Sequence, residues 1–132
     1  MHWSYDGTKL VTSSNDMMAR IWRHDEETGH YYIESVKTFS MMLMNSKFNK
    51  PPLNAETKYT QLVATGGHSG VVTVWNADTD NTTKDVAKLV HTQLDSNLVG
   101  IEIDWQNSKT LAVTGNSKSI YLWNITTPQS PV

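Results

Sequence analysis

The stretch Val11-Thr-Ser-Ser-Asn-Asp-Met-Met-Ala-Arg-Ile-Trp22 sets a pattern that occurs twice more along the chain. Superposing the tryptophans aligns it with Ala64-Thr-Gly-Gly-His-Ser-Gly-Val-Val-Thr-Val-Trp75 and with Ala112-Val-Thr-Gly-Asn-Ser-Lys-Ser-Ile-Tyr-Leu-Trp123. Each copy has a short β-type run, a turn of small polar residues, and a second β-type run that ends in tryptophan. The tryptophans are 53 and 48 residues apart. Self-similarity at such a period indicates a repeat architecture.

A second aromatic residue precedes each copy. Trp3 lies 19 residues before the first repeated tryptophan, and Trp105 lies 18 residues before the third. Phe48 has this role in the middle unit, where an insertion of residues 49–58 follows it. Asp-Gly and Asn-Ser turns between β-branched runs favour hairpins, and long helical patterns are absent. The sequence therefore predicts an all-β chain.

Composition excludes several classes of protein. The 132 residues carry 11 Lys and Arg against 13 Asp and Glu, a net charge of −2 that gives no strong field to attract nucleic acid or anionic lipid. There is no cysteine, which excludes disulfides, cysteine-based zinc sites and a thiol nucleophile. No apolar run approaches the length of a membrane span, and no signal peptide is evident. We expect an intracellular protein, nuclear or cytoplasmic, that takes no cofactor and binds neither nucleic acid nor membrane.

The pattern resembles the WD-repeat family. The residues that carry the resemblance are Leu10–Asp16 with Ala19–Trp22, Val71–Asn76 and Ser119–Asn124. It implies a β-propeller, in which each repeat supplies a four-stranded antiparallel blade. The chain would then be one partial propeller, residues 1–132, with units at about 1–39, 40–90 and 91–125. Three blades form an incomplete ring, because propellers have about 4–8 blades. We therefore expect this chain to be part of a longer protein.

The resemblance also assigns structural roles. In the family, an Asp–His–Ser–Trp hydrogen-bond network braces each blade. The turn carboxylate is present as Asp16 but is replaced by serine in the other two units, and His91 is the one histidine that fits the third unit. The expected structural repeat residues are Asp16, Trp22, Trp75, His91 and Trp123, with the tryptophans packed between blades.

Partners of the family commonly bind the face that carries the turn before the third strand of each blade. The matching positions are Asn15, His68 and Asn116, flanked by Met17, Ser69 and Lys118. These six residues are the candidate partner-binding face. The competing interpretation is that they are ordinary turn residues, chosen because Asn and Gly tolerate positive φ.

Other groups of residues have simpler interpretations. Residues 66–70 lack the final glycine of a nucleophile elbow, and we expect them to form a β-turn between two strands. Residues 24–30 collect two histidines and three carboxylates, and we expect an exposed hairpin that leads to an outer strand at 31–39 rather than a metal site. Asp78, Asp80 and Asp85 are expected in a solvated loop. Met41, Met42 and Met44 are predicted to fill the core, with a soft contact surface as the alternative.

Three hypotheses of function remain. The first is a non-enzymatic scaffold that docks other proteins or peptides. Three short segments resemble the transducin β-like corepressor subunits: Ala19–Trp22, Val74–Ala77 and Asp104–Asn107. This resemblance implies a nuclear transcriptional corepressor assembly with a histone deacetylase. The second is a WD-repeat adaptor of another assembly, in ubiquitin ligation, trafficking or ribosome assembly. The third is a propeller hydrolase, for which only His68 and Asp16 are candidates.

Overall fold

The structure is a computed structural model, and it describes residues 1–54, 59–68, 70–78, 83–90, 101–115 and 119–126. These residues form strands and connections, with no helix among them. The first sheet contains β1 (His2–Trp3), β2 (Lys9–Ser13), β3 (Met18–His24) and β4 (Tyr31–Thr38). The second contains β5 (Leu43–Phe48), β6 (Leu62–Gly67), β7 (Val71–Asn76) and β8 (Asp85–Val90). The third contains β9 (Glu102–Trp105), β10 (Thr110–Thr114) and β11 (Ile120–Asn124).

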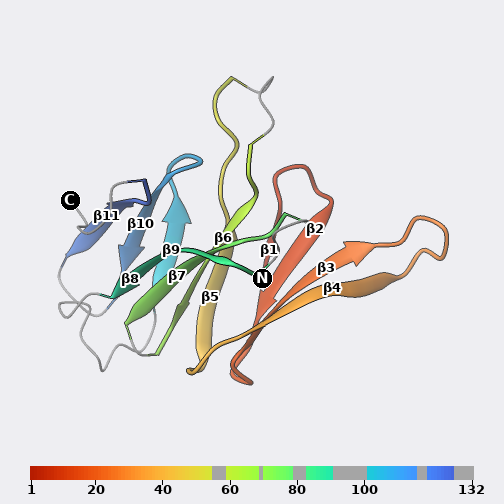
Figure 1. Cartoon of the computed structure of the whole chain (residues 1–132), viewed down its shortest axis with the longest axis horizontal. Helices are drawn as coiled ribbons and strands as arrows, with labels where there is room; N and C mark the ends of the chain where they lie inside the picture. Colours follow the sequence, from red (N-terminus) through yellow and green to blue (C-terminus); the bar gives the residue numbers. More distant parts are fainter. Residues whose placement is uncertain (55–58, 69, 79–82, 91–100, 116–118, 127–132) are drawn as a thin grey trace.

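Each sheet is an antiparallel meander, and the three sheets stand side by side like blades (Figure 1). The first strands of the blades meet near the centre, because β5 contacts β1 and β2, and β9 contacts β5 and β6. The predicted all-β fold of an unclosed propeller is confirmed. In the third blade, the described residues supply three of the four expected strands.

Two hydrophobic cores fill the spaces between blades. The core between the first and second blades includes Val11, Ile21, Phe48, Val63 and Trp75. The core between the second and third blades is drawn from β6, β7, β9, β10 and β11, and its largest members are Trp105 and Trp123. Successive residues of β6 alternate between the two cores, as expected for a strand with side chains on both faces. Consequently the second blade is buried on both sides.

The register of the strands relates the three blades residue by residue. Trp22 pairs with Leu10, and Trp75 and Trp123 pair with Val63 and Leu111 in the same way. Residues at equal positions relative to these pairs are called repeat equivalents below. Because each set has the same backbone environment, differences among repeat equivalents isolate the effect of the side chain.

The two outer faces of the group of blades are uncovered. On the first blade, the aromatic and aliphatic side chains of Trp3, Tyr31 and Ile33 are each about half exposed. On the third blade, Ile120 is 71% exposed and Leu122 is 44% exposed. Trp22 lies on the first of these faces and is only partly buried, whereas Trp75 and Trp123 are buried between blades. Among the described residues no blade packs against Trp22, so its expected place between two blades stays a prediction.

The predicted insertion lies between β5 and β6. Its described residues, 49–54, extend beyond the other turns at the same end of the blades (Figure 1). Asn49 closes its base: its backbone N–H donates to the Leu62 carbonyl at 2.9 Å, and its Oδ1 accepts from the Leu62 N–H at 2.9 Å. Ser4 makes the corresponding pair of bonds to Lys9 in the first blade. The insertion therefore leaves the blade's hydrogen bonding unchanged.

Candidate functional site

The candidate face begins with the turn between β2 and β3, which Ser14 and Asp16 organise. The Met17 N–H donates to the Ser14 carbonyl at 3.2 Å, and Asp16 Oδ1 accepts from the Met18 N–H at 3.0 Å. Met17 has φ of +68°, in the left-handed region that a side chain such as methionine rarely adopts. It is Met17, not Asn15, that takes the strained conformation. Residues held this way persist where surrounding bonds fix them, and they concentrate at functional sites.

The connection between β4 and β5 joins this turn to the next one. The Phe39 N–H donates to the Met17 carbonyl at 2.8 Å, and the Leu43 N–H donates to the Ser14 carbonyl at 3.3 Å. At the other side, the His68 N–H donates to the Met42 carbonyl at 3.1 Å. The turns of the first and second blades and the connection 39–42 thus form one hydrogen-bonded surface, which we call the turn face.

Gly67 makes this close approach feasible. A Cβ atom at Gly67 would lie 2.6 Å from the Met42 carbonyl oxygen and 2.7 Å from the Met41 side chain. Neither distance is compatible with a side chain, and the Met42 oxygen belongs to the backbone and cannot swing aside. The glycine therefore lets the β4–β5 connection rest directly on the end of β6.

Methionine side chains give the turn face its apolar character. Met17 is 42% exposed, Met42 is 45% exposed, and Met44 on the adjoining strand β5 is 38% exposed. Met41 alone packs against the core between the first two blades. The prediction that Met42 and Met44 fill the core is wrong, because they lie on β5 and the connection before it, which no strand among the described residues covers. Methionine is flexible and polarizable, so exposed methionines suit adaptable contacts.

Asp16 contributes an ion pair at the edge of the turn face. Arg20 Nη2 lies 2.6 Å from Asp16 Oδ2, and this hydrogen bond, together with that from the Met18 backbone, lowers the pKa of the Asp16 carboxyl. Both partners are within the same blade. The carboxylate thus braces its own turn and the start of β3.

The tryptophans use partners that the sequence prediction missed. Trp22 Nε1 donates to Thr12 Oγ1 at 2.8 Å, and Trp75 Nε1 donates to Thr65 Oγ1 at 3.0 Å. Both threonines lie ten residues before their tryptophan, and Val113 occupies that place in the third blade. The signal was present in the aligned repeats as a threonine shared by two of them.

The structure brings together only part of the predicted face. Asn15, Met17 and His68 lie on the turn face, with Asn15 exposed and His68 partly buried. Four predicted residues lie outside the described residues: Ser69, His91, Asn116 and Lys118. The contribution of the third blade to the face therefore stays a prediction.

The other acidic groups have structural contacts. Residues 25–30 form the exposed turn between β3 and β4, where Asp25 accepts from the Glu27 N–H and from Thr28 Oγ1. Asp85 pairs with Lys37 across the first two blades at 2.6 Å, and Asp78 accepts from the Gln61 N–H. Asp80 lies outside the described residues. Within the described ranges, no three His, Asp or Glu side chains are placed to hold a metal ion, and no helix is long and apolar enough to cross a membrane.

Comparisons with known proteins agree with the architecture. Residues 1–23 match the family described as WD domain, G-beta repeat. The chain also resembles a solved structure titled "Structure of U3-55K", with a TM-score of 0.68 and 18% identity over 96% of this chain and 33% of that one. The structural likeness shows that the fold is that of WD-propeller blades.

Two sequence relatives are curated under the name Jouberin, from Rattus norvegicus and Mus musculus. Each is 33% identical to this chain over 95 residues, which is 72% of this chain and 8% of the relative. The chain thus spans less than a tenth of the length of these proteins.

Proposed function

We propose that the chain is a non-enzymatic scaffold built from WD repeats, and that its turn face docks other proteins or peptides. The observation that carries this proposal is the turn face itself. Connections from two blades are joined by backbone hydrogen bonds, and they present exposed methionines on a rigid support. A preorganised apolar surface of this kind loses little entropy on binding.

The proposal is favoured over a hydrolase by the contacts of Asp16, one of the two candidate residues. The carboxylate of Asp16 is engaged by Arg20 and by the backbone of its own turn. A general base must reach a proton of the substrate or of a nucleophile, and its orientation is usually fixed by a third group. Asp16 instead serves the turn that carries Met17.

The test is affinity purification of the protein as it occurs in the cell, followed by mass spectrometry, with the wild type and two variants. Met42→Asp places a charge on the turn face. Leu53→Asp is the matched control, because Leu53 is fully exposed on the insertion at the opposite end of the blades. We expect Met42→Asp to lose partners that Leu53→Asp retains. Retention of every partner by Met42→Asp would exclude the turn face as the docking surface.

The identity of the recovered partners tests the narrower hypotheses. The first hypothesis is a transcriptional corepressor subunit in the nucleus that acts with a histone deacetylase. It is supported by the resemblance of the short segments 19–22, 74–77 and 104–107. Recovery of a histone deacetylase with corepressor subunits would favour that role. Recovery of components of a ubiquitin ligase, a trafficking coat or a ribosome-assembly particle would favour the second role, a WD-repeat adaptor of another assembly.

A further inference from the structure

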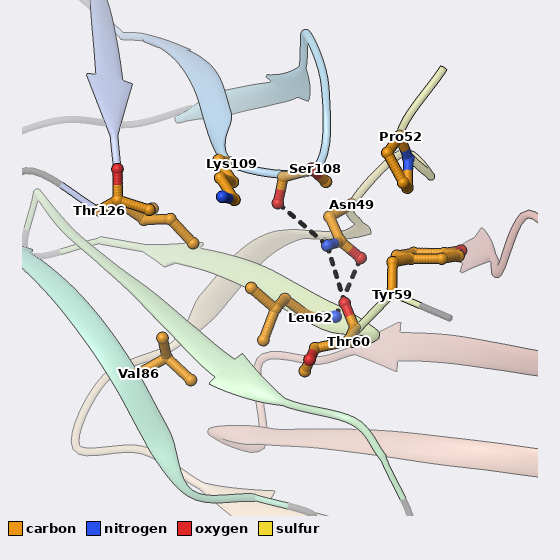
Figure 2. A pocket seen from close by; sticks show the side chains of 10 residues that line it. Asn49, Pro52, Tyr59, Thr60, Leu62, Val86, Ser108, Lys109 and Thr126 are labelled. Atoms are coloured by element: carbon orange, nitrogen blue, oxygen red, sulfur yellow. Dashed lines mark hydrogen bonds between the residues drawn. The ribbon is translucent and has the colours of Figure 1, made fainter. Parts of the chain in front are cut away.

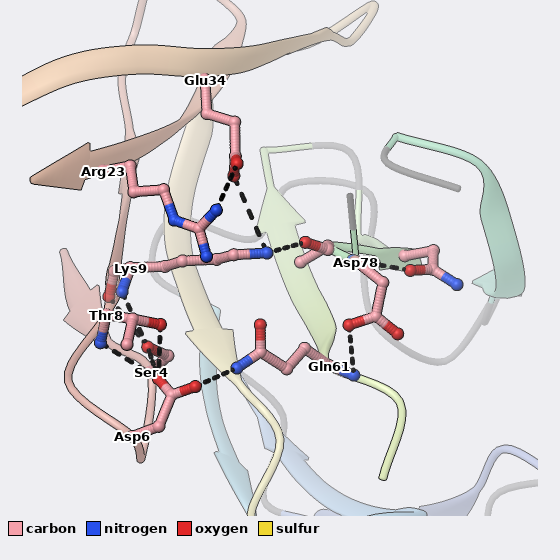
Figure 3. Close-up of polar contacts among 10 residues, drawn as sticks. Ser4, Asp6, Thr8, Lys9, Arg23, Glu34, Gln61 and Asp78 are labelled. Carbon is pink, nitrogen blue, oxygen red and sulfur yellow. Dashed lines mark hydrogen bonds and ion pairs between the residues drawn. The ribbon is translucent and has the colours of Figure 1, made fainter. Parts of the chain in front are cut away.

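Charged side chains fill the gap between the first and second blades (Figure 3). They lie where β2 begins and β7 ends, at the end of the blades opposite the turn face. Lys9 is only 3% exposed, and its Nζ donates to the Ala77 carbonyl at 2.6 Å. Glu34 Oε2 lies 3.7 Å from Lys9 Nζ, and Glu34 Oε1 lies 3.2 Å from Arg23 Nη1. These contacts leave the gap closed by the chain's own charges.

The same gap is completed by a carboxylate from the turn after β1. Asp6 accepts from Ser4 Oγ at 2.6 Å, from Thr8 Oγ1 at 2.8 Å and from Gln61 Nε2 at 2.9 Å (Figure 3). Gln61 belongs to the second blade, so this bond crosses the gap. The first blade thus supplies the Asp6 carboxylate, which accepts a hydrogen bond from the Gln61 side chain just before β6.

The gap between the second and third blades has the same backbone but different side chains. The Ala77 N–H donates to the Gln61 carbonyl at 2.9 Å, and the Ile125 N–H donates to the Lys109 carbonyl at 2.9 Å. Strand register makes Leu62 the repeat equivalent of Lys9, and Val86 the repeat equivalent of Glu34. Two charges of the first gap are therefore replaced by aliphatic side chains in the second.

This replacement leaves a cleft of about 490 Å³, within the size range of ligand pockets (Figure 2). Leu62, Val86 and Ile125 supply apolar wall, and Tyr59 and Pro52 border it from the insertion. Asn49 is buried at its edge and donates to the carbonyls of Thr60 and Ser108 at 3.1 Å each, which ties the insertion to the third blade. These bonds hold in place the edge of the cleft where the insertion meets the third blade.

Lys109 supplies a positive charge at the cleft. It is the repeat equivalent of Gln61, which receives the Asp6 carboxylate in the first gap. Lys109 is exposed and takes part in none of the ion pairs among the residues that the structure describes. Among the described residues, no carboxylate lies beside Lys109 as Asp6 lies beside Gln61 in the first gap.

We propose that this cleft binds a peptide segment of a partner protein in which an aliphatic or aromatic side chain lies next to a carboxylate. The apolar side chain rests on Leu62, Val86 and Ile125, and the carboxylate pairs with Lys109 as Asp6 pairs with Gln61. This site goes beyond the function proposed above, because it lies at the opposite end of the blades from the turn face. Its success or failure is independent of that face.

The test uses the full chain and an array of capped hexapeptides with a variable central pair. The first residue of the pair is Leu, Phe or Ser, and the second is Glu, Gln or Lys. We expect Leu or Phe to exceed Ser by at least about tenfold in affinity, because burying such a side chain contributes more than an exposed contact does. We expect Glu to exceed Gln by about threefold to fivefold, as for an ion pair at an exposed rim.

Three variants keep the test decisive. Lys109→Glu should reverse the preference, so that peptides with Lys exceed those with Glu. Val86→Glu copies Glu34 of the first gap and should abolish selection of acidic peptides; Val86 is 50% exposed, so the fold tolerates the change. Lys84→Glu, which changes the charge equally at the same end without lining the cleft, should bind as the wild type does. An array with no acidic–apolar preference, or one that Lys109→Glu leaves unchanged, would overturn the proposal.

Discussion

The buried charges between the first two blades can be tested by replacing them with their own repeat equivalents. Lys9→Leu and Glu34→Val convert the first gap to the composition of the second. Because the strand backbone is already shown to accommodate Leu62 and Val86 at these positions, the substitutions probe the charges and not the shape of the strands.

The structure sets the expected magnitudes. Lys9→Leu removes a charged hydrogen bond to Ala77 and leaves the Ala77 carbonyl, which is buried, without that donor; we expect a loss of about 2–3 kcal/mol of unfolding free energy. Glu34→Val leaves the Lys9 ammonium buried without a counterion, and we expect a loss of about 3–5 kcal/mol. Replacing both partners by apolar residues is often close to neutral. The double variant should therefore cost at least about 2 kcal/mol less than the sum of the single variants.

The assay is urea unfolding of the full chain, followed by far-UV circular dichroism. Arg23→Leu is the control, because the Arg23 side chain is 37% exposed and its ion pair with Glu34 should contribute no more than about 1 kcal/mol. Additive losses in the double variant would show that Lys9 and Glu34 are not energetically coupled, and would refute the account of the first gap.

Three further predictions concern other parts of the chain. Trp75→Ala should cost about 3–5 kcal/mol in urea unfolding because it leaves a cavity between blades, and Trp22→Ala should cost distinctly less because its side is open to solvent. Burial opposes ionisation of Asp6, but hydrogen bonds from Ser4, Thr8 and Gln61 outweigh it and lower its pKa below 3.8. The resulting stability is present above pH 3.8 and is lost as the pH falls through the lowered pKa, so Asp6→Asn should flatten the acid limb of a stability–pH curve. Gly67→Ala should displace the β4–β5 connection and speed hydrogen exchange of the His68 amide, whereas unchanged exchange would contradict the close contact with Met42.

The sequence predicted those features that depend on neighbours along the chain. The stretch around Trp22 does form two strands joined by a turn, because alternating β-branched residues and a polar turn specify a hairpin locally. Phe48 was matched to Trp3 and Trp105, and each of the three pairs with the same position of the following strand. Repetition made these predictions secure, since each unit supports the interpretation of the others.

Features that depend on a neighbouring blade were not predictable in this way. Lys9 is buried because its ammonium meets the Ala77 carbonyl, 68 residues away along the chain. Met42 is exposed because the connection that carries it lies on the end of β6, which the apolar character of methionine does not reveal. The cleft beside Lys109 could be interpreted only by comparing it with the gap between the first two blades. Only the structure shows that Asp6 crosses to Gln61 and that, among the described residues, no carboxylate has the same place beside Lys109.

The exposed apolar residues on the outer faces have a different meaning from those on the turn face. Ala112, Ile120 and Leu122 of the third blade are the repeat equivalents of Val11, Ala19 and Ile21, which are fully buried in the first core. Likewise Leu10 and Trp22 are the repeat equivalents of Val63 and Trp75, which face that core from the other side. The two outer faces are therefore the two complementary halves of a blade–blade interface. Met17 belongs to a turn and Met42 to a connection between strands, and neither lies on a sheet face. A further blade packed on either outer face would therefore not cover them. This separates the surface needed to extend the propeller from the surface available to a partner.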